Sequence, residues 1–282
     1  MRLVRYGTVG AEMPGLLDKA GNLRDARPWV SDWRGTALAP ELLAELCQRD
    51  ESLLPLVTEP MRYGPCISGV GKVIGIALNY QLHAVETGAR PTTEPNLFLK
   101  ATSALSGADD PIPMPRGGSK LDWEVELGVV IGRTAVNIAA PDAASVIAGY
   151  CLLNDVSERA FQIERGGQQH TKGKSAAGFC PIGPWLLTAD AVPNPQALSL
   201  WTEVNGVRMQ DGSTAQMSVG VFDLVAYCSE FMTLEPGDII ASGTPAGVGH
   251  GMKPPRYLAV GDRVVLGGSG LGEQHHSITA LA

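Results

Sequence analysis

The chain has 282 residues, a net charge of −7 and 44% hydrophobic residues, values typical of a folded globular protein. No Lys/Arg cluster forms a basic face, so we expect neither a nucleic acid nor a membrane as partner. The start of the chain lacks an apolar signal segment, and no apolar run approaches the ~18 residues of a membrane span. The five cysteines include no CxxC pair, which indicates buried thiols in a cytoplasmic protein rather than a zinc site or disulfide framework.

Residues 1–66 are predicted to form a small N-terminal α+β domain. Residues 3–6 and 15–18 have the composition of a strand pair, and residues 39–47 have helical spacing with Leu42, Leu43 and Leu46 on one face. This part contains no cluster of catalytic residue types, which favours a packing or dimerisation role. Residues 53–65 contain three prolines and are predicted to be the linker to a larger domain, 67–282.

The second domain opens with a predicted strand at 72–78 and a short helix at 79–86. His83 and Glu86 are three residues apart, so they share one helix face, as a carboxylate-oriented general base would. A solvated surface pair is the ordinary alternative. The polar segment 87–96 is a candidate lid. A strand at 96–100 ends in Lys100, which either meets an anionic substrate or is solvated.

Two carboxylates stand two apart at the start of an apolar strand, 127–131. Alternate residues of a strand share a face, so Glu124 and Glu126 converge while Trp123 faces the other way. Close carboxylates repel each other unless a cation lies between them, and a divalent cation with oxygen ligands is the simplest candidate. The alternative is a solvated strand edge. Asp155 follows a buried strand at 146–153, as an N-cap or as a further ligand.

The remaining segments exclude several enzyme classes. Residues 166–178 miss the phosphate-loop spacing by one residue, and neither a GxSxG elbow nor a GxGxxG fingerprint is present. A hairpin is predicted at Asn205-Gly206 after the strand 200–204, and a helix at 221–231. A strand at 239–242 leads into the loop 243–249, whose backbone amides could bind an anion, and 256–266 is expected to close the sheet. With 34 glycines and 20 prolines, a mostly β, α+β fold is expected.

Taken together, these stretches resemble the fumarylacetoacetate hydrolase family over about residues 70–272. The segments that carry the resemblance occur in the family's order: GIALNY at 75–80 with His83 and Glu86, WEVEL at 123–127, NDVSER at 154–159, GKS at 173–175, PGD at 236–238 and SGTP at 242–245. The resemblance implies a compact mixed β-roll with a small N-terminal domain, in a homodimer or a dimer of dimers.

The resemblance also assigns roles to residues. It implies that Glu124, Glu126 and Asp155 hold a metal, Mg²⁺ first with Mn²⁺ or Ca²⁺ possible. It implies that His83 and Glu86 activate water. The remaining assignments are Lys174 as a catalytic residue and Tyr80, Lys100, Arg159, Gln162 and Thr244 as substrate-binding residues.

Within the family, the chain looks similar to the branch that acts on sugar acids. This implies hydrolysis of the C3–C4 bond of 2,4-diketo-3-deoxy-L-rhamnonate or -L-fuconate to pyruvate and L-lactate. The same residues suit acylpyruvate or fumarylpyruvate hydrolysis, ureidoglycolate cleavage, oxaloacetate decarboxylation, or non-catalytic binding of a 2-oxo acid. The segments Gln169-His170 and Ala176-Ala177 depart from the branch pattern, which leaves the substrate open.

Overall fold

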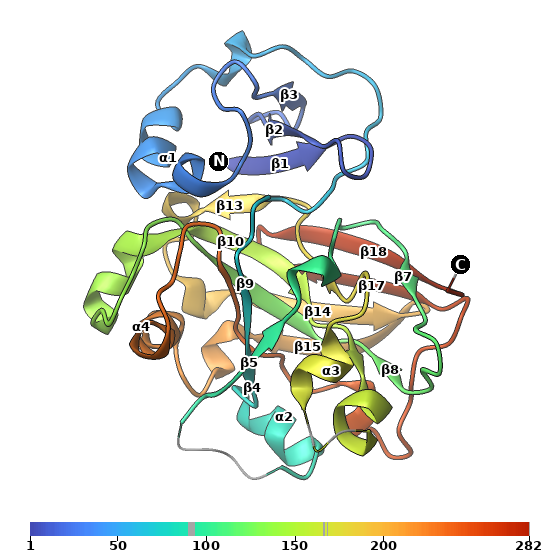
Figure 1. The fold of residues 1–282 in the computed structure, drawn as a ribbon. Coiled ribbons are helices and arrows are strands. Elements are labelled where there is room, and N and C mark those ends of the chain that lie inside the picture. The colour runs from blue at the N-terminus through green and yellow to red at the C-terminus, as the bar shows by residue number, and fades with distance from the viewer. Residues whose placement is uncertain (90–93, 166, 168, 282) are drawn as a thin grey trace.

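A computed structural model describes residues 1–89, 94–165, 167 and 169–281, so part of the predicted lid, residues 90–93, lies outside the described residues. Within them the chain forms a mixed α+β fold built mostly from two sheets (Figure 1). In the order of its strands, the larger sheet contains β3 (Leu23–Asp25), β2 (Met13–Leu17), β1 (Arg2–Tyr6), β13 (Leu186–Thr188), β10 (Ile147–Asn154), β9 (Val125–Ile131), β16 (Ile239–Ala241), β4 (Val73–Ala77) and β5 (Asn96–Lys100). The smaller sheet contains β15 (Val207–Ser213), β14 (Ser199–Val204), β17 (Arg263–Gly268), β18 (Gly272–Thr279) and β7 (Ile112–Pro113).

Short strand pairs and helices complete the described chain. The pairs are β8 (Leu121–Asp122) with β11 (Ser157–Glu158), and β6 (Leu105–Ser106) with β12 (Cys180–Pro181). The α-helices are α1 (Pro40–Leu46), α2 (Gln81–Glu86), α3 (His170–Lys174) and α4 (Val221–Phe231). None of the described helices is both long and apolar enough to cross a membrane.

The N-terminal strands continue the larger sheet rather than forming a sheet of their own. Strand β1 pairs antiparallel with β13, Arg2 opposite Leu187 and Leu3 opposite Leu186, and β13 pairs in turn with β10. In Figure 1 the N-terminal unit lies at one end of the molecule, above the other strands of the two sheets. Arg62 also binds Asp110 across the two parts, with Nε donating to Oδ1 at 2.6 Å. The division at residue 66 therefore crosses a continuous hydrogen-bonded sheet.

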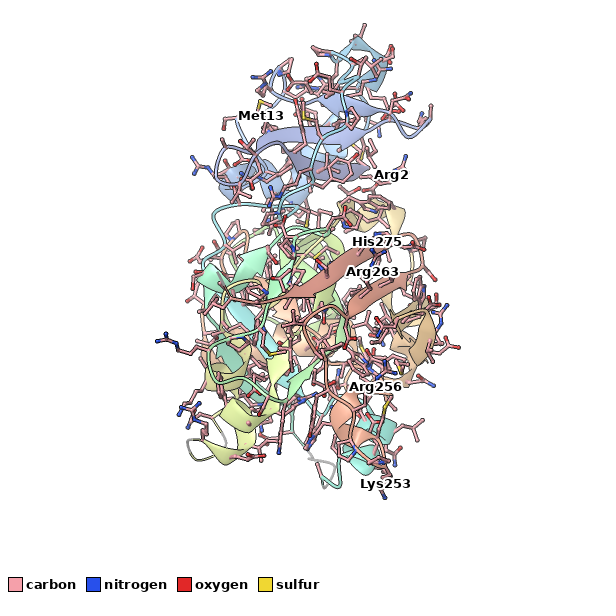
Figure 2. The ribbon with its side chains drawn as sticks, turned by 90° about the vertical axis from the view of Figure 1, so that its right-hand side faces the viewer. Arg2, Met13, Lys253, Arg256, Arg263 and His275 are labelled. Carbon is pink, nitrogen blue, oxygen red and sulfur yellow. The ribbon has the colours of Figure 1, made fainter. Side chains whose placement is uncertain are left out.

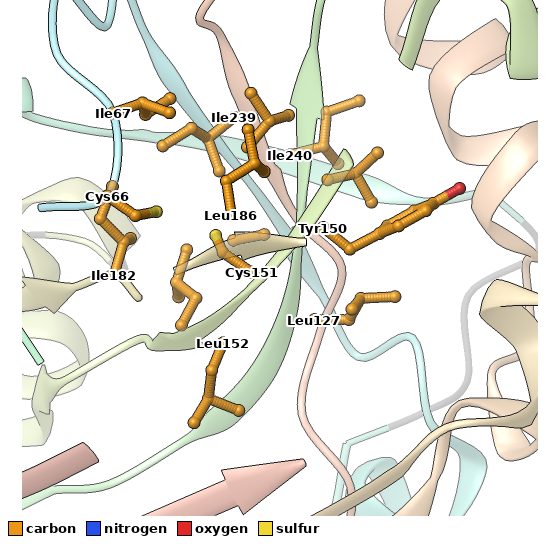
Figure 3. Packing of buried hydrophobic residues seen from close by; sticks show 14 of the residues in the cluster. Cys66, Ile67, Leu127, Tyr150, Cys151, Leu152, Ile182, Leu186, Ile239 and Ile240 are labelled. Carbon is orange, nitrogen blue, oxygen red and sulfur yellow. The ribbon is translucent and has the colours of Figure 1, made fainter. Parts of the chain in front are cut away.

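The central strands β9 and β10 are buried along their whole length, which explains their continuous apolar sequence. A strand covered on both faces has no polar face, so β-branched and leucine side chains fill it. Leu127 and Leu152 are fully buried, and Figure 3 shows them with residues of β13 and β16 in one packed cluster. Burial of each such side chain contributes about 1.5–3 kcal/mol, which fixes the register of this pair of strands.

The smaller sheet has one solvated face. Along β18 exposed and buried residues alternate: His275 and Ser277 point outward, whereas His276 and Ile278 are buried. Figure 2 shows His275 and Arg263 on the outer side of the β17–β18 pair. Alternation with a period of two is the pattern of an antiparallel sheet that covers a core on one side.

Most predicted elements are confirmed. The helix at 221–231 is α4, with Leu224, Val225 and Cys228 fully buried as expected. The Asn205-Gly206 turn is also confirmed, with φ of 52° and 76°, the positive values that a type I′ turn requires. Within 256–266, the segment expected to close the sheet, strand β17 begins at Arg263. A turn precedes it, closed by Ala259, whose N–H donates to Asp262 at 2.8 Å.

Candidate active site

Three carboxylates meet where β9 and β10 lie side by side. Glu126 is on β9 opposite Leu153, Glu124 directly precedes β9, and the Asp155 N–H donates to the Glu124 carbonyl at 2.9 Å. One oxygen from each of Glu124, Glu126 and Asp155 lies within 4.8 Å of the others. These side chains are 4%, 2% and 1% exposed, which rules out the alternative of a solvated strand edge.

Three cations neutralise most of this buried charge. The Lys174 ammonium donates to Glu124 Oε2 at 2.7 Å and also to Asp155, which Lys100 contacts as well. Arg159 donates from Nη2 to Glu124 Oε1 at 2.6 Å. Burial would raise the pKa of Glu124, but the charges of Lys174 and Arg159 outweigh it and hold this pKa well below its usual range. Glu124 is therefore an ionised carboxylate.

Glu126 differs from its neighbours because it has no salt bridge to any described residue. Its Oε2 accepts a hydrogen bond from the Gly243 N–H at 2.9 Å. Burial and the charges of Asp155 and Glu124 raise the pKa of Glu126 well above its ordinary value. A divalent cation beside the triad would remove this repulsion, and carboxylate oxygens are the ligands that hard cations prefer. The donor set thus fits a divalent metal ion.

The predicted dyad is formed on α2. His83 Nδ1 lies 2.9 Å from Glu86 Oε1, and the His83 side chain is buried. Glu86 in turn accepts hydrogen bonds from the backbone N–H groups of Gly247 at 2.8 Å and Val248 at 3.4 Å. The glycine-rich loop, residues 243–249, which the sequence analysis suggested could bind an anion, therefore binds the Glu86 carboxylate. With Glu86 accepting from Nδ1–H, the lone pair of His83 is on Nε2.

The triad and His83 of the dyad line the same cavity, which has a volume of about 350 Å³. Its lining includes residues of α2 and α3. These helices lie at the end of the molecule away from the N-terminal unit (Figure 1). Of the predicted site residues, the structure brings together at this cavity His83, Glu124, Glu126, Asp155, Arg159, Gln162, Lys174 and Thr244. Lys100 and Glu86 lie behind the lining and contact it through Asp155 and His83. Tyr80 is buried with a hydroxyl that no described residue contacts by a hydrogen bond.

Several predicted substrate-binding groups are already hydrogen-bonded to the protein. Arg159 donates from Nε to Asp122 at 2.8 Å and from Nη1 to the Gln162 side-chain oxygen at 3.1 Å. The Thr244 hydroxyl donates to the Val125 carbonyl at 2.9 Å. These contacts fix the side chains in place, so each can offer only its remaining hydrogen-bonding capacity to a ligand.

Three residues of the site were not assigned roles from the sequence. Asp122 accepts hydrogen bonds from Arg159 and from the backbone N–H groups of Gly249 at 2.7 Å and His250 at 3.0 Å. It therefore links the end of the glycine-rich loop to Arg159. His170 and His250 both line the cavity. No local motif marks Asp122 or His250, because Asp122 meets Gly249 and His250 only through contacts that span 127 and 128 residues. His170 stood out only as a departure from the expected branch pattern.

Comparison with known proteins agrees with this geometry. A family model described as "Fumarylacetoacetate (FAA) hydrolase C-terminal" matches residues 72–279. The chain belongs to the fumarylacetoacetate hydrolase family. A curated relative from Burkholderia multivorans is 52% identical over 275 residues and 97% of each chain; its name gives hydrolase as a provisional class and states no substrate.

Solved structures of several family members align with the whole chain. A fumarylacetoacetate hydrolase from Exiguobacterium antarcticum is 34% identical, with a TM-score of 0.86 and full coverage of both chains. A 5-carboxymethyl-2-hydroxymuconate delta-isomerase from Mycobacterium smegmatis is 29% identical, with a TM-score of 0.76 and full coverage. Maleylpyruvate hydrolase from Sphingobium, solved with manganese and pyruvate, is 28% identical, with a TM-score of 0.80 and full coverage.

Proposed function

We propose that this protein is a metal-dependent hydrolase that cleaves the C3–C4 bond of a 2,4-diketo acid and releases pyruvate. The observation that carries the proposal is the pairing, in one cavity, of a buried carboxylate triad with the His83–Glu86 dyad. The Sphingobium relative solved with manganese and pyruvate supports the choice of a divalent metal and a pyruvate-forming substrate. Glu124, Glu126 and Asp155 would hold the ion, with Mg²⁺ or Mn²⁺ as the first candidates.

Charge balance also supports a divalent ion. If all are ionised, the carboxylates of the site exceed its cations by two charges; they are Glu86, Asp122, Glu124, Glu126 and Asp155 against Lys100, Arg159 and Lys174. A divalent ion would cancel this excess in a site where unbalanced charge is costly.

The residues of the chain divide the reaction between them. His83 Nε2 takes a proton from water, and Glu86 stabilises the resulting imidazolium; such general-base catalysis contributes about 10²–10⁴-fold. Hydroxide adds to C4, and we assign the Lys174 ammonium to stabilise the new oxyanion. Collapse of this adduct breaks the C3–C4 bond, and the imidazolium returns its proton to C3 to give pyruvate. A bound divalent ion supplies Lewis-acid stabilisation of negative charge on the 2-oxo acid end.

The finer assignment within this reaction class follows the sequence resemblance. We propose 2,4-diketo-3-deoxy-L-rhamnonate or -L-fuconate as substrate, with L-lactate as the second product, in a homodimer or a dimer of dimers. Acylpyruvates are the nearest alternative substrates, because they contain the same scissile bond.

The test is pyruvate release from the sugar-derived diketo acid and from acetylpyruvate, with Mn²⁺ or Mg²⁺ and with EDTA. Release that EDTA abolishes, with lactate as co-product, is expected from the sugar acid. Activity on acetylpyruvate alone would keep the bond cleavage and remove the sugar-acid assignment. Absence of release from both would contradict the proposed reaction.

A further inference from the structure

A chain of hydrogen bonds runs from the carboxylate triad to an imidazole on the cavity wall. Arg159 donates to Glu124 at 2.6 Å and, through Nη1, to Gln162 Oε1 at 3.1 Å. Gln162 Nε2 lies 3.1 Å from His170 Nδ1. Guanidinium groups only donate, so the amide oxygen of Gln162 must face Arg159 and its NH₂ must face His170. His170 Nδ1 is therefore an acceptor, and the proton of the neutral ring is on Nε2.

The Nε2–H donor of His170 has no partner among the residues that the structure describes. His170 is the first residue of α3 and is half-buried, with its ring centroid 5.1 Å from that of Phe98 at a tilt of 30°. Both residues line the cavity. Burial and the charge of Lys174 lower the pKa of His170, in agreement with a neutral ring at pH 7. The ring is thus held on two sides and offers one N–H.

The cations near this cavity are already paired with carboxylates of the protein. Lys174 and Arg159 are bound by Glu124, Asp155 and Asp122, and Lys100 is bound by Asp155. Among the described lining residues, no Lys or Arg is left without a carboxylate partner to receive a second carboxylate of a substrate. The remaining wall has apolar side chains, among them Ile76, Phe98 and Ile163, and uncharged polar ones. The latter are Thr87, Asn96, Thr244 and His250.

We propose that His170 determines specificity by donating a hydrogen bond from Nε2–H to an uncharged oxygen on the acyl half of the substrate. The cavity then selects an acylpyruvate whose acyl half carries a hydroxyl group over one that carries a second carboxylate. This inference rests on the proposed function and specifies the substrate class of that site.

Two substitutions separate the hydrogen bond from the packing of the ring. His170→Phe keeps a ring against Phe98 and removes both nitrogens, whereas His170→Gln keeps an amide N–H at similar reach. His275→Phe is the matched control, because His275 is a half-exposed side chain on the outer face of β18 (Figure 2). The substrates are acetylpyruvate, a 2,4-diketo acid with a hydroxylated acyl end, and fumarylpyruvate.

The wild-type protein is expected to prefer the hydroxylated acid. H170F should lower kcat/KM for this acid by roughly 10–100-fold, which is the effect of one lost hydrogen bond in a desolvated site. The kcat/KM of H170F for acetylpyruvate should differ from that of the wild type by less than about 3-fold. H170Q should recover part of the loss, and H275F should match the wild type. Equal losses on both substrates, or a preference for fumarylpyruvate, would overturn the inference. If the wild type turns over none of the three, the proposed function fails, and the substrate class with it.

A second readout uses the metal-free protein and needs no turnover. Nitrogen-15 NMR of the histidine rings at pH 7 should show His170 as the Nε2–H tautomer, assigned by its loss in H170F. Gln162→Leu, which removes the donor to Nδ1, should shift His170 toward a mixture of tautomers. An Nδ1–H tautomer or a charged ring in the wild type would overturn the hydrogen-bond direction and the inference, whatever the activity of the enzyme.

Discussion

Substitution of Lys174 by methionine tests how the buried charges of the site are balanced. Methionine keeps the length and the apolar stem of the side chain but removes the ammonium, which is 3% exposed and contacts both Glu124 and Asp155. Removing one partner of a buried ion pair typically costs about 3–5 kcal/mol, because the other charge stays buried without compensation. For a chain of this size, that loss lowers the unfolding midpoint by on the order of 10 °C.

The loss of stability in K174M should depend on whether a divalent metal is bound. A divalent ion at the triad replaces the missing positive charge, so saturating Mn²⁺ should close at least half of the stability gap that K174M shows in EDTA. Thermal unfolding of wild type and variant in both conditions measures this. Lys72→Met is the matched control: Lys72 pairs with buried Asp238, outside the lining of the cavity, so its loss should be the same in Mn²⁺ and EDTA. Wild-type stability of K174M in EDTA, or equal gaps in both conditions, would refute the reasoning.

Three further predictions follow from the site and the fold. Glu124→Gln should abolish both EDTA-sensitive pyruvate release and stabilisation by Mn²⁺, and normal values of either would contradict the metal assignment. His83→Asn should lower kcat by about 10²–10⁴-fold yet bind oxalate, a pyruvate analogue, within a few-fold of the wild type; unimpaired turnover would remove the dyad from the mechanism. Burial raises the pKa of Asp110, but hydrogen bonds from Arg62 and Gly107 outweigh burial and lower this pKa below its ordinary value. The Asp110 carboxylate therefore stabilises the fold above pH ~4, and this contribution is lost as the pH falls through the folded pKa. Asp110→Asn should therefore be less stable than wild type at pH 7 by about 1–3 kcal/mol and lose less between pH 5 and 3, and parallel pH profiles would contradict this.

Local sequence patterns predicted the elements that place the site. The alternation at Glu124 and Glu126, the apolar runs of β9 and β10, and the three-residue spacing of His83 and Glu86 each follow from the geometry of a single strand or helix. The structure confirms that the three predicted carboxylates converge and that the predicted dyad forms. Their roles in metal binding and catalysis remain predictions.

The sequence did not show which buried cation pairs with which carboxylate. The pairing of Lys100 with Asp155 and the position of Asp122 between Arg159 and the glycine-rich loop depend on tertiary contacts with no local signature. The segment 256–266, expected to close the sheet, also runs through a turn before β17 begins at Arg263. In this turn Gly261 has a φ of 99° and Asp262 accepts from the Ala259 N–H at 2.8 Å.

The junction of β1 with β13 covers what would otherwise be an edge of the larger sheet. Without β1, the three-residue strand β13 would end the larger sheet with unpaired backbone N–H and C=O groups, a template for pairing with another chain. The N-terminal strands cover this edge and move the boundary of the sheet to the short strand β3. A chain shortened to residues 67–282 would expose the edge at β13, so its first failure should be self-association through backbone pairing rather than loss of the distant carboxylate triad.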